Sequence, residues 1–154
     1  MNSLIALTFD DGPNFETTIP MLDILQKYNV VGSFFVCGKH INNDTKAIIK
    51  RAYQMGCEID NHSYTHGNMT ELSPVEISNE VEKTSKLIKD TIGEEVKLFR
   101  FPSGDYSKKA CEFIYSQGMV GIQWDVDSVD WKQTGAEEEY NRVMKKVIPG
   151  SILL

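Results

Sequence analysis

The sequence of 154 residues lacks the features of a nucleic-acid or membrane protein. Its 16 basic residues are outnumbered by 22 acidic residues, which gives a net charge of −6, and they form no basic block. Because nucleic-acid binding requires clustered Lys and Arg, we expect no nucleic-acid partner. The longest apolar runs are far shorter than the ~18 residues that a membrane span requires, so we expect no membrane segment in this chain.

Cysteine is also scarce, with only Cys37, Cys57 and Cys111. Their odd number and the lack of CxxC spacing argue against a zinc ribbon and a disulfide framework, so buried free thiols are predicted.

The first seven residues lack a basic n-region and a cleavage site, and no secretory leader is predicted. Two interpretations stay open: the protein remains inside the cell, or the chain is cut from a larger one.

Composition and pattern point to one α/β domain over residues 1–154. Hydrophobic residues make up 41% and charged residues 25%, which is typical of a globular domain. Strands are expected at 4–9, 30–36, 57–61, 96–99, 119–124 and 151–154, and helices at 18–28, 44–55, 74–90, 107–117 and 136–147. The clearest helix start is the capping box of Ser73 and Glu76, with Pro74 at the first helical position. The alternation predicts parallel strands, in a barrel or an open doubly wound sheet.

Polar residues follow the ends of several predicted strands. They are Asp10 and Asp11 after the first strand, His62 and His66 after the third, Arg100 after the fourth, and Asp127 and Asp130 after the fifth. The carboxyl ends of parallel strands share one rim, where sites form. We therefore expect these side chains to converge on one pocket.

The two histidines at the third strand have i, i+4 spacing. One helical turn would put the imidazoles of His62 and His66 on the same side, within reach of one ion. This spacing alone is weak evidence. A carboxylate from another strand end would complete a site of two histidines and one carboxylate with open positions, the catalytic type of metal site.

The pair Asp10 and Asp11 allows two interpretations. The following Gly12 and Pro13 alone explain a turn. In the functional interpretation, one carboxylate binds a metal and the other takes a proton from metal-bound water. Arg100 stands between aromatic residues, which favours a buried partner, and it would lower the pKa of a neighbouring carboxylate.

Two other features are less specific. Asp130 and Trp131 are either a loop with a packed indole, or a polar group beside a wall for a sugar ring. His40 has no partner in the pattern and is interpreted as an exposed structural residue.

Four segments together form a recognisable set of motifs. They are TFDDGP at 8–13, HSYTH at 62–66, RFPS at 100–103 and DSVDW at 127–131. With these motifs in this order, essentially the whole chain resembles the polysaccharide deacetylase family, also called the NodB-homology domain or carbohydrate esterase family 4. The resemblance implies a distorted, incomplete (β/α) barrel, similar to a TIM barrel. It also implies a metal-dependent hydrolase that removes acetyl groups from N-acetylated sugars.

The resemblance also implies roles for individual residues. The metal ligands would be Asp11, His62 and His66, with Zn²⁺ as the expected ion and Co²⁺ or Mn²⁺ as alternatives. Asp10 would be the catalytic base and Arg100 would orient it. The backbone N–H of Ser103 would face the oxyanion, Trp131 would wall the pocket, and Asp130 would tune the catalytic acid.

The chain departs from the family pattern in two places. Ser103 stands where the family often has an aromatic residue, so substrate preference is expected to differ. The fifth family motif, L-x-H, supplies the general acid, and residues 151–154 resemble its strand without reaching the histidine. We therefore expect the acid and the last elements of the barrel to be missing, with a rate loss of about 10² to 10⁴. Such a barrel would expose the edges of its first and last strands and self-associate.

The leading function is deacetylation of N-acetylglucosamine in peptidoglycan or chitin-like polymers. The alternatives are an acetyl-xylan esterase, a metal- and sugar-binding module without turnover, and, less favoured, a non-haem iron oxygenase. The resemblance implies a location outside the cytoplasm or at the cell wall.

Overall fold

The computed structural model describes residues 4–154. Residues 1–3, part of the stretch in which no leader is predicted, lie outside this range. The strands are β1 (Ala6–Asp10), β2 (Ser33–Val36), β3 (Glu58–Asn61), β4 (Leu98–Phe99), β5 (Val120–Gly121) and β6 (Ile152–Leu153). The helices are α1 (Thr18–Tyr28), α2 (Lys46–Gln54), α3 (Pro74–Ile92), α4 (Lys108–Ser116) and α5 (Ala136–Met144). Three 3₁₀ turns are η1 (Gly38–His40), η2 (Pro102–Gly104) and η3 (Asp130–Lys132).

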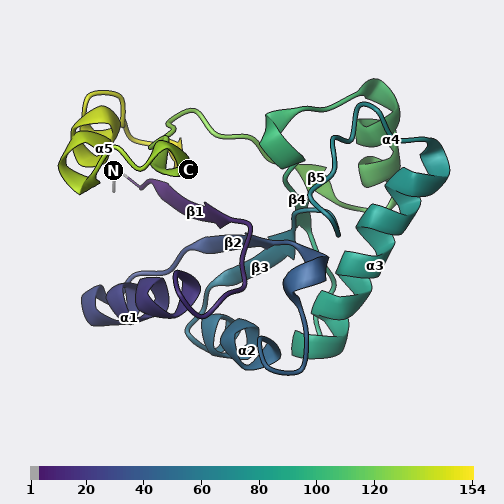
Figure 1. Ribbon diagram of the computed structural model, residues 1–154, viewed down its shortest axis with the longest axis horizontal. Helices are drawn as coiled ribbons and strands as arrows, with labels where there is room; N and C mark the ends of the chain where they lie inside the picture. Colours follow the sequence, from purple (N-terminus) through teal and green to yellow (C-terminus); the bar gives the residue numbers. More distant parts are fainter. Residues whose placement is uncertain (1–3) are drawn as a thin grey trace.

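All strand pairs are parallel, in the order β5-β4-β3-β2-β1-β6. The strands form a curled half-barrel with helices outside it (Figure 1). From β1 to β5 each strand pairs with the next one in sequence, so the sheet grows in one direction, as in a (β/α) barrel. An open doubly wound sheet would instead reverse its order near β1. The predicted α/β class with parallel strands is confirmed, and the barrel is the correct alternative.

The last strand does not pair with the strand before it. β6 pairs with β1, through Ala6 with Ile152 and Leu7 with Leu153. On its other side, the segment that follows β5 returns to it, with a bridge from Val126 to Leu153. The prediction that the first strand has an open edge is therefore wrong, because β1 is paired on both sides.

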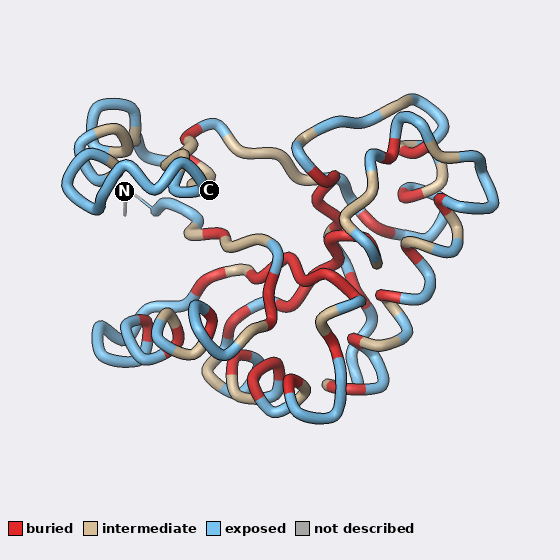
Figure 2. The backbone as a smooth tube through the Cα atoms, in the orientation of Figure 1, coloured by how far each residue is buried: buried red, intermediate tan, exposed pale blue. Residues whose placement is uncertain are grey.

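The hydrophobic core lies between the sheet and helices α1 to α4, and most buried residues are there (Figure 2). Its most buried members include Leu22 of α1, Ile49 of α2, Ile88 of α3 and Ile114 of α4. Helix α5 has no buried residue. None of the helices in residues 4–154 is long and apolar enough to cross a membrane.

Helix α3 begins as the sequence predicts. Oγ of Ser73 accepts a hydrogen bond from the N–H of Glu76, whose carboxylate accepts one from the N–H of Ser73. The helix ends at Ile92, where Gly93 takes a left-handed conformation with φ 83°. This well-defined start fixes the placement of the helix that borders the site described below.

Several predicted elements are shorter in the structure. The strand predicted at 119–124 keeps only Val120–Gly121, because the chain then leaves β4 and turns toward β6.

The prediction of buried free thiols is confirmed for Cys37 and Cys57, whereas Cys111 is a free thiol that is only half-buried.

Candidate metal centre and active site

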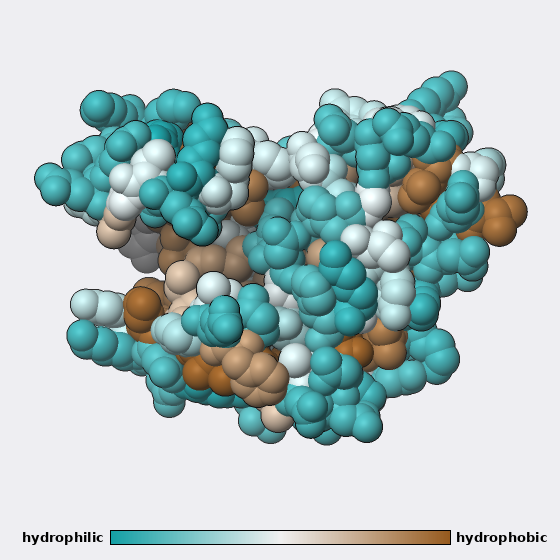
Figure 3. Space-filling model, viewed as in Figure 1, coloured by the Kyte–Doolittle hydropathy of each residue, from teal (hydrophilic) through white to brown (hydrophobic). Residues whose placement is uncertain are grey.

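A cavity of about 810 Å³ opens at the carboxyl ends of the strands, between α1 and the C-terminal part of the chain. Figure 3 shows a recess with hydrophobic side chains in its floor on this side of the molecule. The predicted site residues that line the cavity are Asp10, Asp11, His62, His66, Ser103, Asp127, Asp130 and Trp131. The strand-end residues of distant segments thus converge, as expected.

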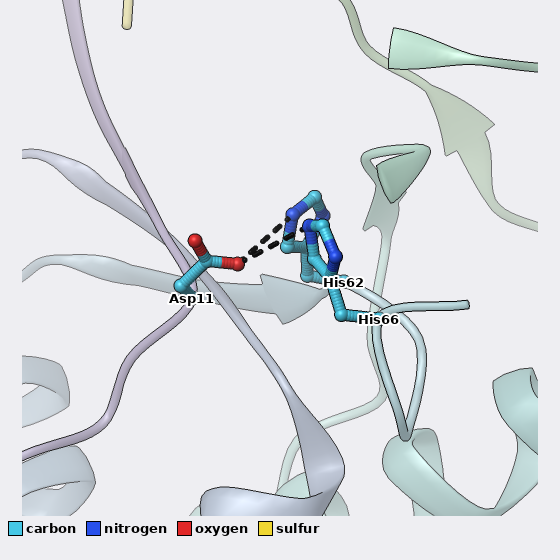
Figure 4. Close-up of side chains that lie close together, drawn as sticks. All are labelled: Asp11, His62 and His66. Atoms are coloured by element: carbon cyan, nitrogen blue, oxygen red, sulfur yellow. Dashed lines mark ion pairs between the residues drawn. The ribbon is translucent and has the colours of Figure 1, made fainter. Parts of the chain in front are cut away.

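Three side chains in this cavity, those of Asp11, His62 and His66, lie close enough together to hold one metal ion (Figure 4). Oδ1 of Asp11 lies 3.5 Å from Nε2 of His62 and 3.4 Å from Nε2 of His66. Ligand atoms bound tetrahedrally to Zn²⁺ at ~2.0–2.1 Å stand about 3.3 Å apart. These two distances are therefore compatible with one small divalent cation.

A hydrogen bond fixes the ring of His62 and leaves Nε2, the nitrogen that faces Asp11, free to bind a metal ion. Its Nδ1 donates a hydrogen bond to the backbone oxygen of Arg100 over 2.8 Å, so Nε2 carries the free lone pair. His62 is buried, and this desolvation holds its pKa well below the ordinary value for histidine. A neutral imidazole with this tautomer is the form that binds a metal ion.

The segment from His62 to His66 is an irregular loop, and the predicted helical turn is wrong. Ser63 and His66 both have positive φ, 65° and 64°, which a helix does not allow. Glu80 of α3 holds the loop, because its carboxylate accepts hydrogen bonds from the N–H groups of Tyr64 and Thr65. The imidazoles still meet, with ring centroids 4.9 Å apart.

Arg100 lies directly after β4 and is completely buried, as the prediction of a buried partner requires. Its Nη1 donates to Oδ1 of Asp10 over 2.9 Å and to Oγ1 of Thr8 over 2.7 Å. The guanidinium also packs over the ring of Phe35, 4.2 Å from its centroid. These contacts fix the carboxylate of Asp10 on the inner side of the cavity.

The pKa of Asp10 differs from the sequence expectation. Burial raises it from 3.8 to about 6, and the opposing attraction of Arg100 does not offset this desolvation. The expected direction was downward, because the sequence reveals the cation and not the loss of water around the carboxylate. Asp10 is thus a carboxylate of increased basicity beside the ligand group, with its Oδ2 3.7 Å from Nε2 of His62.

The remaining predicted residues lie on the rim of the cavity. Ser103 is in η2 with φ 57°, and Gly104 follows it in the same turn. Asp130 and Trp131 form η3, and Trp131 is 72% exposed, so its indole is not a packed core residue. Trp131 lines the cavity, and its role as a wall for a sugar ring stays a prediction.

Two residues that contact the site were assigned no role there from the sequence. Thr8 links Arg100 to β6, because its hydroxyl donates to the backbone oxygen of Leu153 over 2.6 Å. His40 is half-buried and bonds the backbone of Asp11, so its interpretation as an exposed residue without a partner is wrong. Its position just after the second strand is the same strand-end signal that marked the other residues.

Residues 2–122, more than half of the chain, match the family model of the polysaccharide deacetylases. The chain belongs to the polysaccharide deacetylase family. The match includes the motifs at 8–13, 62–66 and 100–103 and ends before the one at 127–131.

Known relatives are similar to this chain over nearly its whole length. A bifunctional xylanase/deacetylase of Pseudobutyrivibrio xylanivorans is 39% identical over 98% of the chain, which covers 24% of that protein. A peptidoglycan-N-acetylglucosamine deacetylase of Bacillus cereus is 35% identical over 97% of the chain, which covers 54% of that protein. The chain thus spans about a quarter and about half of these relatives.

A solved structure supports the fold assignment. The crystal structure of a pseudoenzyme of carbohydrate esterase family 4 from Bacillus anthracis has a TM-score of 0.92 and 32% identity. The comparison covers 99% of this chain and 54% of that chain. The fold alone therefore does not decide whether a member of the family turns over substrate.

Proposed function

We propose that this chain is a metal-dependent hydrolase that removes acetyl groups from N-acetylated sugars of a polysaccharide. The substrates proposed are N-acetylglucosamine units of peptidoglycan or chitin-like oligomers. The observation that carries the proposal is that one cavity holds the group of Asp11, His62 and His66 together with Asp10. The carboxylate of Asp10 is bound from behind by the buried Arg100.

Asp11, His62 and His66 would hold the divalent cation. Two imidazoles and one carboxylate suit Zn²⁺, with Co²⁺ or Mn²⁺ as alternatives because availability also decides occupancy. A bound cation of this kind supplies Lewis acidity toward an acyl carbonyl and lowers the pKa of water to ~7. The residues around the cation would supply the base, the oxyanion donor and the acid.

Asp10 receives the proton of the attacking water in this proposal. Its raised pKa of about 6 makes it a better base than a solvent-exposed carboxylate, and Arg100 fixes its orientation. The backbone N–H of Ser103 would donate to the oxyanion, since Ser103 lines the same cavity. Such a donor lowers the barrier by roughly 3–4 kcal/mol in related acyl transfer.

The leaving amine must also gain a proton. Among the described residues that line the cavity, the histidines are His62 and His66, and both serve as ligands in this proposal. We propose that Asp10 returns to the amine the proton it took from water as the C–N bond breaks. Acetamide and water then give acetic acid and the amine, which at neutral pH are acetate and the ammonium ion. On the rim, Asp130 would tune the catalytic acid that the family pattern supplies from its fifth motif, and Trp131 would wall the sugar ring.

Two other functions stay open on the same observation. An acetyl ester needs less help for its leaving group, so an acetyl-xylan esterase would work without an additional histidine. A metal- and sugar-binding module without turnover is the second alternative, because a family member of the same fold is a pseudoenzyme. For all three functions we propose a location outside the cytoplasm or at the cell wall, in line with the peptidoglycan-directed relative.

The test is acetate release from an N-acetylglucosamine oligomer and from an acetylated xylan, first with metal stripped and then with Zn²⁺ restored. Zinc-dependent acetate from the oligomer supports the N-deacetylase. Release from xylan alone would move the assignment to the esterase. Tight zinc binding with no release from either substrate would leave a binding module, and no zinc binding would overturn the metal centre. Asp10→Asn is the matched variant, which should bind zinc and release no acetate.

A further inference from the structure

The ligand Asp11 is presented by an unusual turn. Its φ is 71°, a left-handed value that residues with a side chain rarely adopt. The N–H of Gly12 donates to the backbone oxygen of Asp10 over 2.9 Å, which closes a tight turn around Asp11. Such a conformation persists only where neighbouring contacts hold it. The contacts on this turn therefore decide where the carboxylate of Asp11 points.

One of these contacts is the side chain of His40. Its Nδ1 lies 2.7 Å from the backbone oxygen of Asp11, and because a carbonyl only accepts, the histidine donates. The second contact comes from the same segment, where the N–H of Cys37 donates to the backbone oxygen of Gly12 over 2.9 Å. Residues 37–40 thus hold the turn at the carbonyl groups of Asp11 and Gly12.

The same segment also holds the loop that carries the two histidine ligands. The N–H of Gly38 donates to the backbone oxygen of Ser63 over 3.0 Å, and the N–H of Lys39 donates to that of Tyr64 over 2.9 Å. A Cβ on Gly38 would lie 2.5 Å from Cδ2 of Tyr64, so the segment approaches the loop closely. The turn η1 therefore joins the two parts of the chain that supply metal ligands.

His40 is itself fixed in place. Its backbone N–H donates to the oxygen of Cys37 over 3.0 Å, and Oγ1 of Thr45 donates to the oxygen of His40 over 2.6 Å. Its side chain is half-buried and its Nδ1 is committed to the carbonyl of Asp11. Among the described residues, the atoms placed to bind one metal ion belong to Asp11, His62 and His66 and lie within 4.8 Å of one another. His40 is not one of these three residues.

We propose that His40 is a positioning residue of the metal centre, which orients the ligand Asp11 through a hydrogen bond to its backbone. This inference rests on the proposed metal centre. Loss of an outer contact that orients a ligand typically weakens metal binding about 10- to 100-fold. The contact needs a donor at the position of Nδ1, three bonds from Cα, and the rest of the ring is dispensable.

The test uses two variants of similar size. In His40→Asn the amide nitrogen is also three bonds from Cα and keeps the donor, whereas in His40→Gln the amide nitrogen is one bond farther away. We expect His40→Gln to bind Zn²⁺ about 10- to 100-fold more weakly than wild type in a chelator competition, and His40→Asn to bind near wild type. The visible spectrum of bound Co²⁺ should change in His40→Gln and be preserved in His40→Asn. Both metal-free variants should unfold at the wild-type temperature.

The outcomes separate this inference from the proposed function. Unchanged zinc affinity in both variants, or equal weakening together with a lower unfolding temperature, would overturn the role of His40 and leave the metal centre standing. His66→Ala is the reference for loss of a ligand. A wild-type chain that binds no zinc would overturn both the metal centre and the role of His40.

Discussion

The guanidinium of Arg100 lies 2.9 Å from Oδ1 of Asp10, with none of its own side chain exposed and 14% of that of Asp10 exposed. The pair joins the end of β4 to the end of β1 across the inside of the sheet. A second hydrogen bond, to Oγ1 of Thr8, helps satisfy the buried cation. Because the pair is withdrawn from water, breaking it leaves a buried charge without its partner. Structure and chemistry therefore depend on the same contact.

Replacing Arg100 by glutamine should reduce both stability and activity. The loss of the partner of Asp10 should lower the free energy of unfolding by on the order of 3 kcal/mol. The pKa of Asp10 should rise further, so that less of it is available as a base at pH 7, with a rate loss of about 10² or more. Denaturant unfolding and acetate release measure the two effects.

The matched control is the exposed ion pair of Arg51 and Asp23, which also has a short contact of 2.6 Å. Arg51→Gln should change the free energy of unfolding by less than about 1 kcal/mol, because surface pairs are screened by water. Equal effects of the two arginine variants would contradict the role assigned to burial at Arg100.

Metal addition should stabilise the folded protein. A ligand that binds only the folded state at 100 times its dissociation constant adds about 2.7 kcal/mol to the free energy of unfolding. We expect Zn²⁺ to raise the unfolding temperature of wild type and EDTA to reverse it. His66→Ala should remove this response, while Lys86→Ala, which changes an exposed pair with Asp90, should keep it. A zinc-induced shift that survives in His66→Ala would place the ion elsewhere.

Ser103 should act through its backbone. Because the proposed oxyanion donor is the N–H group, Ser103→Ala and Ser103→Gly should both retain acetate release near the wild-type rate. Glycine also adopts the observed φ of 57° without steric cost. Steady-state kinetics on the oligomer measures the effect. A large fall in kcat for Ser103→Ala would instead assign a chemical task to the hydroxyl.

The sequence predicted well what depends on local pattern. The helix start at Ser73, the parallel order and the convergence of Asp11, His62 and His66 all follow from capping, alternation and the rule that strand ends share a rim. The roles of these ligands remain predictions, whereas their proximity is a structural finding.

The errors concern features that depend on tertiary contacts. The segment from His62 to His66 is no helical turn because Glu80, from a later helix, holds its backbone. The pKa of Asp10 goes up because its burial is decided by segments far apart in the sequence. Likewise, β1 has no open edge because β6 pairs with it instead of continuing beside β5.

The buried carboxyl of Asp60 should make stability depend on pH. Asp60 lies in β3 and is 4% exposed. Its Oδ1 accepts a hydrogen bond from the N–H of Leu98, whereas its Oδ2 has no hydrogen-bond partner among the described residues. Burial raises its pKa from 3.8 to about 6. The folded state therefore holds the proton more tightly than the unfolded state. The stability that this group contributes is complete below pH 3.8 and is lost as pH rises through about 6.

Asp60→Asn removes this dependence. We compare the free energy of unfolding of the variant with that of wild type at pH 4 and at pH 7. From pH 4 to pH 7, the variant should gain stability relative to wild type by on the order of 2 kcal/mol. Urea unfolding of the metal-free proteins at the two pH values measures it, and the other titrating groups cancel in the difference. Asp90→Asn is the control of opposite sign, because the hydrogen bond from Lys86 lowers the pKa of Asp90 and its stability is lost as pH falls. A difference for Asp60→Asn that stays constant with pH would mean that water reaches this carboxylate in solution.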